Sequence, residues 1–136
     1  IGGAQDPQKV NRLADTTNNL ISSYTSLFKV VSISKRECVL VLKDLLNNVD
    51  NIKILDIALS RSAVPGLLLF IRLVHFKHEF HRSSGIAFVF PGELESLLLR
   101  KYKIFSRRVK PENEPIKRFA SFLKLNRKFG IKVIYE

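Results

Sequence analysis

The sequence predicts one domain of the α/β (α+β) class over residues 1–136, with the order helix, strand, helix, strand, strand across residues 7–76. Three observations predict this class. The chain has 136 residues, which is enough for one hydrophobic core but too few for two. Segments with apolar residues at helical spacing alternate with short segments rich in β-branched and aromatic residues. A single cysteine excludes a fold held together by internal disulfides.

The first predicted helix begins at Asp6 and Pro7, because aspartate is a favoured N-cap and proline fits the first helical position. A strand is predicted next over residues 27–33, which are β-branched and aromatic and too few for a helix. The residues that recur at helical intervals on the first helix are Val10, Leu13, Thr17, Leu20 and Tyr24.

The second predicted helix begins at Ser34. Together with Glu37 three residues later, Ser34 matches the capping box that starts many helices. On this helix Cys38 would be a buried structural thiol rather than a nucleophile. Two asparagines end the helix after residue 46. Its apolar face contains Cys38, Val41, Leu42, Leu45 and Leu46.

The remaining elements are predicted from turn residues and from runs of apolar residues. Pro65 and Gly66 fit the two central positions of a type II turn. In chain order these elements are a strand over residues 52–57, a turn at 62–66, a buried strand over 67–76, a loop at 77–85, a strand over 86–90, a helix over 93–102 and a loop at 110–115.

Positive charge is concentrated in the second half of the chain. Residues 1–60 hold 7 basic and 6 acidic side chains, whereas residues 61–136 hold 16 basic and 6 acidic ones. Because so many like charges repel one another in the free protein, this distribution indicates a polyanionic partner. The longest charge-free stretch beyond the first helix, residues 62–71, has half of the roughly 20 residues that a membrane-spanning helix needs. No membrane partner is therefore expected.

Cations in the basic half alternate with aromatic residues. Lysine and arginine bind phosphates, and we expect the aromatic residues between them to pack in the core. The candidate RNA-binding residues are Arg100, Lys101, Lys103, Arg107, Arg108, Lys117, Arg118, Lys124, Arg127, Lys128 and Lys132.

The histidines His75, His78 and His81 follow one another at intervals of three, which suggests a zinc site. On a strand, however, His75 and His81 share one face and His78 points away. The segment also lacks the H-E-x-x-H spacing that directs two histidines at one zinc ion. We therefore expect no metal, no other cofactor and no catalytic residue. The alternative is a small metal-dependent nuclease that uses these histidines with Glu79.

Several short segments resemble the N-terminal domain of the small-subunit ribosomal protein S-eight family. The strongest is the C-terminal segment over residues 123–135, in which Lys128, Gly130 and Val133 match the family's pattern. The other matching segments are Asp6-Pro7, Leu13-Ala14-Asp15, Ser34-Lys35, Leu42-Lys43 and the glycine-led strand over residues 66–73.

The resemblance implies a non-catalytic constituent of the small subunit of an organelle ribosome, mitochondrial or alternatively plastid, that binds ribosomal RNA. It places Asp6, Pro7, Ser34 and Lys35 near the RNA. Residues 74–122 are longer than the segment that connects the corresponding elements in the family. The resemblance therefore implies that they are an insertion, which would contact RNA or neighbouring ribosomal proteins. The family's C-terminal domain is then lost or supplied by a separate chain.

The resemblance also implies a C-terminal β-hairpin over residues 123–135, with a strand to Asn126, a turn over residues 127–130 and a second strand over 131–135. The residues themselves allow an amphipathic helix over 116–128 instead. Such a helix would carry Ile116, Phe119, Ala120 and Leu123 on one side and Lys117, Lys124 and Lys128 on the other. The hairpin is predicted for residues 123–135, and residues 116–122 fit either structure.

Overall fold

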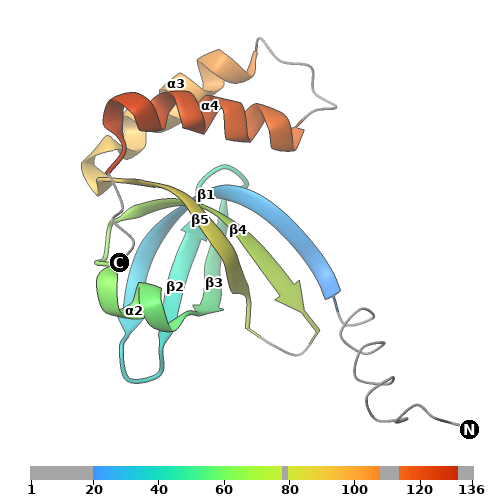
Figure 1. Ribbon diagram of the computed structural model, residues 1–136, viewed down its shortest axis with the longest axis vertical. Helices are drawn as coiled ribbons and strands as arrows, with labels where there is room; N and C mark the ends of the chain where they lie inside the picture. Colours follow the sequence, from blue (N-terminus) through green and yellow to red (C-terminus); the bar gives the residue numbers. More distant parts are fainter. Residues whose placement is uncertain (1–19, 78–79, 108–113, 132–136) are drawn as a thin grey trace, which may run out of the picture.

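The computed structural model describes residues 20–77, 80–107 and 114–131 and belongs to the predicted α+β class (Figure 1). Most of the predicted first helix and most of the second strand of the predicted hairpin lie outside these residues. Leu20 and Tyr24, expected on the first helix, belong to a strand, so the helix prediction is wrong there. The elements are β1 (Leu20–Ser34), β2 (Val39–Asp44), β3 (Val49–Leu55), α2 (Ile57–Ser62), β4 (Leu68–Phe76), β5 (Arg82–Phe90), η1 (Gly92–Leu94), α3 (Glu95–Ser106) and α4 (Glu114–Phe129).

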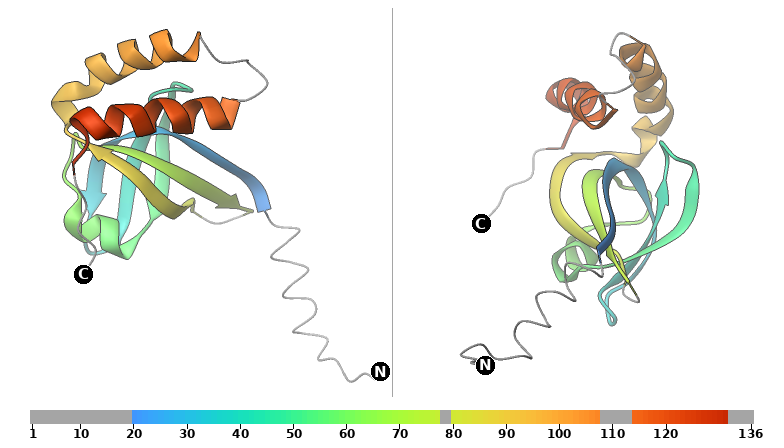
Figure 2. Two further views of the ribbon diagram at one scale, coloured as in Figure 1. Left: turned by 45° about the horizontal axis from the view of Figure 1, so that its top comes forward. Right: turned by 90° about the vertical axis from the view of Figure 1, so that its right-hand side faces the viewer.

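The five strands form one antiparallel sheet in the order β3-β2-β1-β4-β5, and the sheet curls until its two outer strands meet. The meeting point is a parallel bridge between Ile54 and His81. There the N–H of Leu55 donates to the carbonyl of His81 at 3.0 Å, and the N–H of His81 donates to the carbonyl of Lys53 at 3.1 Å. The curled sheet is therefore a small, partly open barrel (Figure 2).

The connectivity of this barrel is a three-stranded meander, a short helix and a hairpin. The first strand of the hairpin, β4, pairs with β1, and the second strand, β5, reaches β3 in parallel. Five strands connected in this way form a barrel of the OB-fold type. The 15-residue β1 pairs with both halves of the barrel and has register shifts between Leu20 and Ser22 and between Val30 and Ser32. Such irregularities bend a strand and increase its twist.

Two hydrophobic cores lie on opposite faces of the sheet. The interior of the barrel contains residues from all five strands together with Leu59 of α2. The second core lies between the outer faces of β1, β4 and β5 and the two C-terminal helices, which cross one end of the barrel (Figure 1). In β4, Leu69 and Ile71 face the interior, whereas Leu68 and Phe70 face the helices. This double burial explains why the first four residues of β4, Leu68 to Ile71, are all apolar rather than alternating.

The predicted strands over residues 27–33 and 86–90 are confirmed within β1 and β5, and the strand over 67–76 is confirmed as β4 from Leu68. The strand over 52–57 is confirmed only to Leu55, because Asp56 caps α2 and Ile57 begins it. The helix over 93–102 begins in η1 and continues in α3. Strand β5 begins at Arg82, so the predicted loop is shorter than expected. The turn at Pro65 and Gly66 is also confirmed, since the N–H of Leu67 donates to the carbonyl of Val64 at 3.2 Å. Gly66 has a φ of 93°, as the third position of a type II turn requires.

The predicted helix over residues 34–46 is wrong. The hydroxyl of Ser34 does accept a hydrogen bond from the N–H of Glu37, at 3.4 Å, as a helix cap would. The chain then turns, however, and Cys38 lies half-buried in the turn with a φ of 58° rather than on an apolar helical face. Residues Val39–Asp44 form β2, in which every second side chain is buried. A hydroxyl bonded to a nearby N–H stabilises a turn as readily as a helix, and the strand pairing on both sides decides between them.

The predicted hairpin is wrong over residues 123–129, because α4 continues to Phe129. The alternative, an amphipathic helix over 116–128, is correct, but its buried face is not the expected one. Phe122 and Leu125 are buried, whereas Ile116 is 66% exposed and Phe119 is 50% exposed. Residues 74–122, expected as an insertion, supply β5, α3 and half of the second core. None of the described helices is long and apolar enough to span a membrane.

Candidate nucleic-acid interface

Helices α3 and α4 are held on the barrel by an aromatic cluster around Phe122. This side chain is fully buried, and its ring centroid lies 4.6 Å from that of Phe70 on β4 and 5.3 Å from that of Tyr102 on α3. Phe90 on β5 packs edge-on at 6.2 Å. Phe122 therefore contacts the two strands beneath α4 and the helix beside it, and it fixes the position of both helices.

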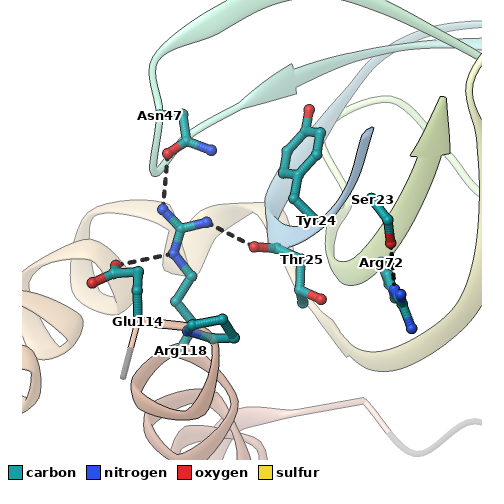
Figure 3. Close-up of a pocket in the computed structure, with 8 residues that line it drawn as sticks. Ser23, Tyr24, Thr25, Asn47, Arg72, Glu114 and Arg118 are labelled. Carbon is teal, nitrogen blue, oxygen red and sulfur yellow. Dashed lines mark hydrogen bonds and ion pairs between the residues drawn. The ribbon is translucent and has the colours of Figure 1, made fainter. Parts of the chain in front are cut away.

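Arg118 of α4 ties the same helix to the barrel through polar contacts (Figure 3). Its guanidinium donates to the backbone carbonyl of Thr25 at 2.7 Å, to the side-chain oxygen of Asn47 at 2.8 Å and to Glu114 at 3.2 Å. The side chain is only 13% exposed. Asn47 lies in the β2–β3 turn, so Arg118 joins β1, this turn and α4.

The β2–β3 turn that receives Arg118 is fixed by Asp44. This buried carboxylate accepts hydrogen bonds from the hydroxyl of Ser26 at 2.5 Å and from the backbone N–H groups of Leu46 at 3.1 Å and Asn47 at 3.0 Å. It also accepts from the side-chain amide of Asn47 at 2.7 Å. Asp44 therefore holds the side-chain amide of Asn47, which accepts the hydrogen bond from Arg118, in one orientation.

Glu114 at the start of α4 completes this network. It accepts a hydrogen bond from the hydroxyl of Tyr102 at 3.0 Å and lies 3.6 Å from the ammonium group of Lys117. Partial burial acts to raise the pKa of Glu114, but the Tyr102 hydroxyl and the cations Lys117 and Arg118 together lower it below its usual value. Glu114 therefore stays ionised and compensates two cations of α4.

Two of the predicted RNA-binding cations, Lys117 and Arg118, thus face inward and pair with Glu114. The side chain of Lys117 is 11% exposed and pairs with Glu114. Periodicity predicted the opposite for Lys117, because Ile116 and Phe119 were the expected core residues. The buried side chains of Lys117 and Arg118 share the carboxylate of Glu114 as their ionic partner, which allows both to lie between α4 and the barrel.

The other cations of α3 and α4 form a cluster that we call the cationic surface. On α3 the exposed residues Arg100, Lys103 and Arg107 recur at helical spacing, and the ammonium group of Lys124 on α4 lies 4.8 Å from the centre of the Phe105 ring. None of its members lies within salt-bridge distance of a described carboxylate; Glu95 of α3 pairs with Lys29 instead, at 3.0 Å. The cationic surface consists of Arg100, Lys101, Lys103, Arg107, Lys124, Arg127 and Lys128.

Two of the remaining predicted site residues, Ser34 and Lys35, are not brought to this surface. Ser34 and Lys35 lie in or beside the β1–β2 turn, at the end of the barrel opposite the helices (Figure 1). The other four predicted residues lie outside the described part of the chain: Asp6, Pro7, Arg108 and Lys132.

His75 and His81 stack across the β4–β5 hairpin, with ring centroids 4.0 Å apart. They meet across the hairpin rather than along one strand, so the alternation expected for a single strand does not apply, and His78 and Glu79 lie outside the described residues. The described residues contain no group of three or more His, Cys, Asp or Glu side chains that could hold a metal ion. Burial, and to a lesser degree the neighbouring His75, lowers the pKa of His81 below 6.5, although a hydrogen bond with the Lys53 backbone partly offsets this.

This lowered pKa predicts a loss of stability in mild acid. As the pH falls through about 6.5, the unfolded chain binds a proton at residue 81 that the folded chain does not bind, so the free energy of unfolding decreases until the folded pKa is reached. His81→Gln should therefore flatten the pH dependence of urea unfolding between about pH 7 and pH 5. His75→Gln, which removes only the neighbouring charge, should flatten it less. An unchanged pH profile in His81→Gln would contradict the assignment.

Sequence reasoning missed a cavity of about 560 Å³ between α4 and the barrel. It is lined by β1, β4, the β2–β3 turn and the first turn of α4 (Figure 3). On β4, Arg72 donates from Nε to the hydroxyl of Ser23 at 2.7 Å. Tyr24 and Asn47 line the same cavity. No motif in the sequence connects these residues, which become neighbours only when the barrel forms.

Comparison with known proteins identifies a family for the chain. No curated protein and no solved structure matches it significantly. A family model described as "Family of unknown function (DUF7986)" matches residues 5–136, which is nearly the whole chain. The chain therefore belongs to the DUF7986 family.

Proposed function

We propose that this protein binds RNA and holds the RNA phosphates on the cationic surface of α3 and α4. The observation that carries the proposal is the contrast between two groups of cations on the same helices. Lys117 and Arg118, which have a carboxylate partner in Glu114, face inward. The seven members of the cationic surface have no described carboxylate within salt-bridge distance. Uncompensated like charges repel one another, and RNA phosphates relieve that repulsion while releasing counterions.

The barrel supports the same proposal by analogy. Barrels of the OB-fold type bind oligonucleotides or oligosaccharides on a strand face and adjoining loops. A fold alone does not establish a function, but the net charge of +11 favours a nucleic acid over a neutral sugar. We further propose that the protein is part of the small subunit of an organelle ribosome, mitochondrial rather than plastid. Its partners would be ribosomal RNA and neighbouring ribosomal proteins.

The ribosomal setting rests on the resemblance to the S-eight family. The helix expected after Ser34 is a turn and a strand, and the hairpin expected over residues 123–129 is part of α4, so the resemblance now depends chiefly on the glycine-led strand at Gly66. In this setting Ser34 and Lys35 would bind RNA at the far end of the barrel, so the RNA would contact two separate surfaces. The role would be structural, without catalysis or a cofactor.

The experiment is a binding titration of the full chain with a labelled single-stranded RNA of about 16 nucleotides, the upper range for one OB fold. We expect a Kd of about 100 μM or lower near physiological salt. Incubation with Mg²⁺ or Zn²⁺ should leave the RNA intact, and the tagged protein should sediment with the small ribosomal subunit of mitochondria. No binding at low salt would refute RNA binding, metal-dependent cleavage would favour the nuclease alternative, and sedimentation apart from the ribosome would refute the setting.

A further inference from the structure

The cavity beside α4 lies where β1 extends past the end of β2. Pairing between these strands begins at Phe28 and Asp44, so residues 22–26 of β1 have no strand on that side. Arg118 takes the place of a strand partner there by donating to the carbonyl of Thr25. The first turn of α4 forms one wall of this half-open cavity, and its volume of about 560 Å³ lies within the range of small-molecule sites.

Two side chains in the cavity have unused hydrogen-bonding groups. The Nε of the exposed Arg72 donates to Ser23, which orients the guanidinium, while its two terminal nitrogens have no described partner (Figure 3). The hydroxyl of Tyr24 likewise has no hydrogen-bond partner among the described residues, and its pKa is raised by burial and by the charge of Asp44. Tyr24 is therefore a neutral phenol that can donate or accept a hydrogen bond.

The charges around the cavity favour an anion. Arg72 and Arg118 contribute two positive charges, and Glu114 contributes one negative charge. An arginine fork whose Nε is already held has two terminal nitrogens for phosphate oxygens. Glu114 is an acceptor for a ribose hydroxyl or a base amino group. The guanidinium of Arg118, immobilised by three hydrogen bonds, is a planar group of the kind on which unpaired bases stack.

We infer that this cavity binds one nucleotide unit, with its phosphate on Arg72 and its base and sugar between Tyr24, Arg118 and Glu114. The choice of ligand class rests on the proposed RNA-binding function. A small carboxylate would satisfy Arg72 but would leave the hydroxyl of Tyr24 without a partner. A nucleoside 5′-monophosphate supplies the anion, the donor groups and the planar ring together, and it is small enough for the volume available.

The experiment titrates the full chain with adenosine 5′-monophosphate and uridine 5′-monophosphate and follows the backbone amide resonances of the cavity residues. Adenosine, which lacks the phosphate, and inorganic phosphate are the matched ligands. We expect both monophosphates to shift these resonances. Adenosine and inorganic phosphate should each bind at least about tenfold more weakly than the monophosphates, because a charge-assisted hydrogen bond contributes about that factor to affinity. Arg72→Gln should weaken monophosphate binding about tenfold or more, and Tyr24→Phe about threefold or more.

Arg61→Gln on α2, an exposed arginine that does not line the cavity, is the matched control and should bind as the wild type does. If Arg72→Gln also weakens binding of single-stranded RNA, the nucleotide unit belongs to the RNA. If it weakens only the monophosphates, the ligand is a free nucleotide. Monophosphate binding without any RNA binding would refute the proposed function and leave the cavity assignment standing. An Arg72→Gln variant that binds the monophosphates as tightly as the wild type would overturn the assignment.

Discussion

Phe122→Ala should lower the free energy of unfolding by about 3–5 kcal/mol, the range for a buried phenylalanine replaced by alanine. The expected loss is large because Phe122 is fully buried and contacts Phe70, Phe90 and Tyr102. Domains of this size have a total stability of about 5–15 kcal/mol, so the variant would lose a large share of it. Urea unfolding followed by circular dichroism measures the change.

Phe119→Ala is the matched control, because it removes the same side chain three residues earlier on the same helix. Phe119 is 50% exposed, and its described ring contact is with Phe88 at 5.6 Å. Its loss should be about 1 kcal/mol or less. If Phe122→Ala does not fold, Phe122→Leu should still lose more stability than Phe119→Leu. Equal losses at the two positions would show that α4 does not pack with Phe122 toward the barrel.

Replacing Arg100, Lys103 and Arg107 of α3 together with glutamine should weaken RNA binding about tenfold or more. The three residues share one exposed face of the helix, and each lost phosphate contact lowers the salt slope by about 0.7 for single-stranded RNA. The slope of log K against log salt should therefore fall in magnitude by about two units. Fluorescence anisotropy with labelled RNA at several salt concentrations measures both quantities.

A matched control removes three exposed cations from the barrel instead, by replacing Lys53, Arg61 and Lys77 with glutamine. Both triple variants have the same net charge, so any difference between them reports position rather than total charge. The control should retain the salt slope of the wild type and lose less than about threefold in affinity. Equal loss in the two variants would show that the RNA responds to net charge alone.

The strands were predictable where local sequence and tertiary pairing agree. Residues 51–54 of β3 alternate between exposed and buried positions, and β4 begins with an apolar run over residues 68–71 that follows a Pro-Gly turn. Strand β2 was not predictable in this way. The hydrogen bond of the Ser34 hydroxyl that indicates a helix start is present in the structure, and only the pairing of β2 with β1 and β3 overrides the helix.

The charge of the candidate site was predictable, whereas its geometry was not. Arg118 is indistinguishable by sequence from Arg127, yet Arg118 is 13% exposed and bonded to Thr25 and Asn47, and Arg127 is exposed. The cavity combines side chains from positions 23 to 118 that share no periodicity or motif. Such a site becomes visible only when the topology of the barrel is known.

The most direct measurement of the central claim is the salt dependence of single-stranded RNA binding by the full chain. If the seven cations of the cationic surface each neutralise one phosphate, the slope of log K against log salt should be about −5. Between about 50 and 200 mM salt, the affinity should then fall by about a factor of 10³. A slope near zero, with binding unchanged across this range, would contradict the claim that these cations hold the RNA.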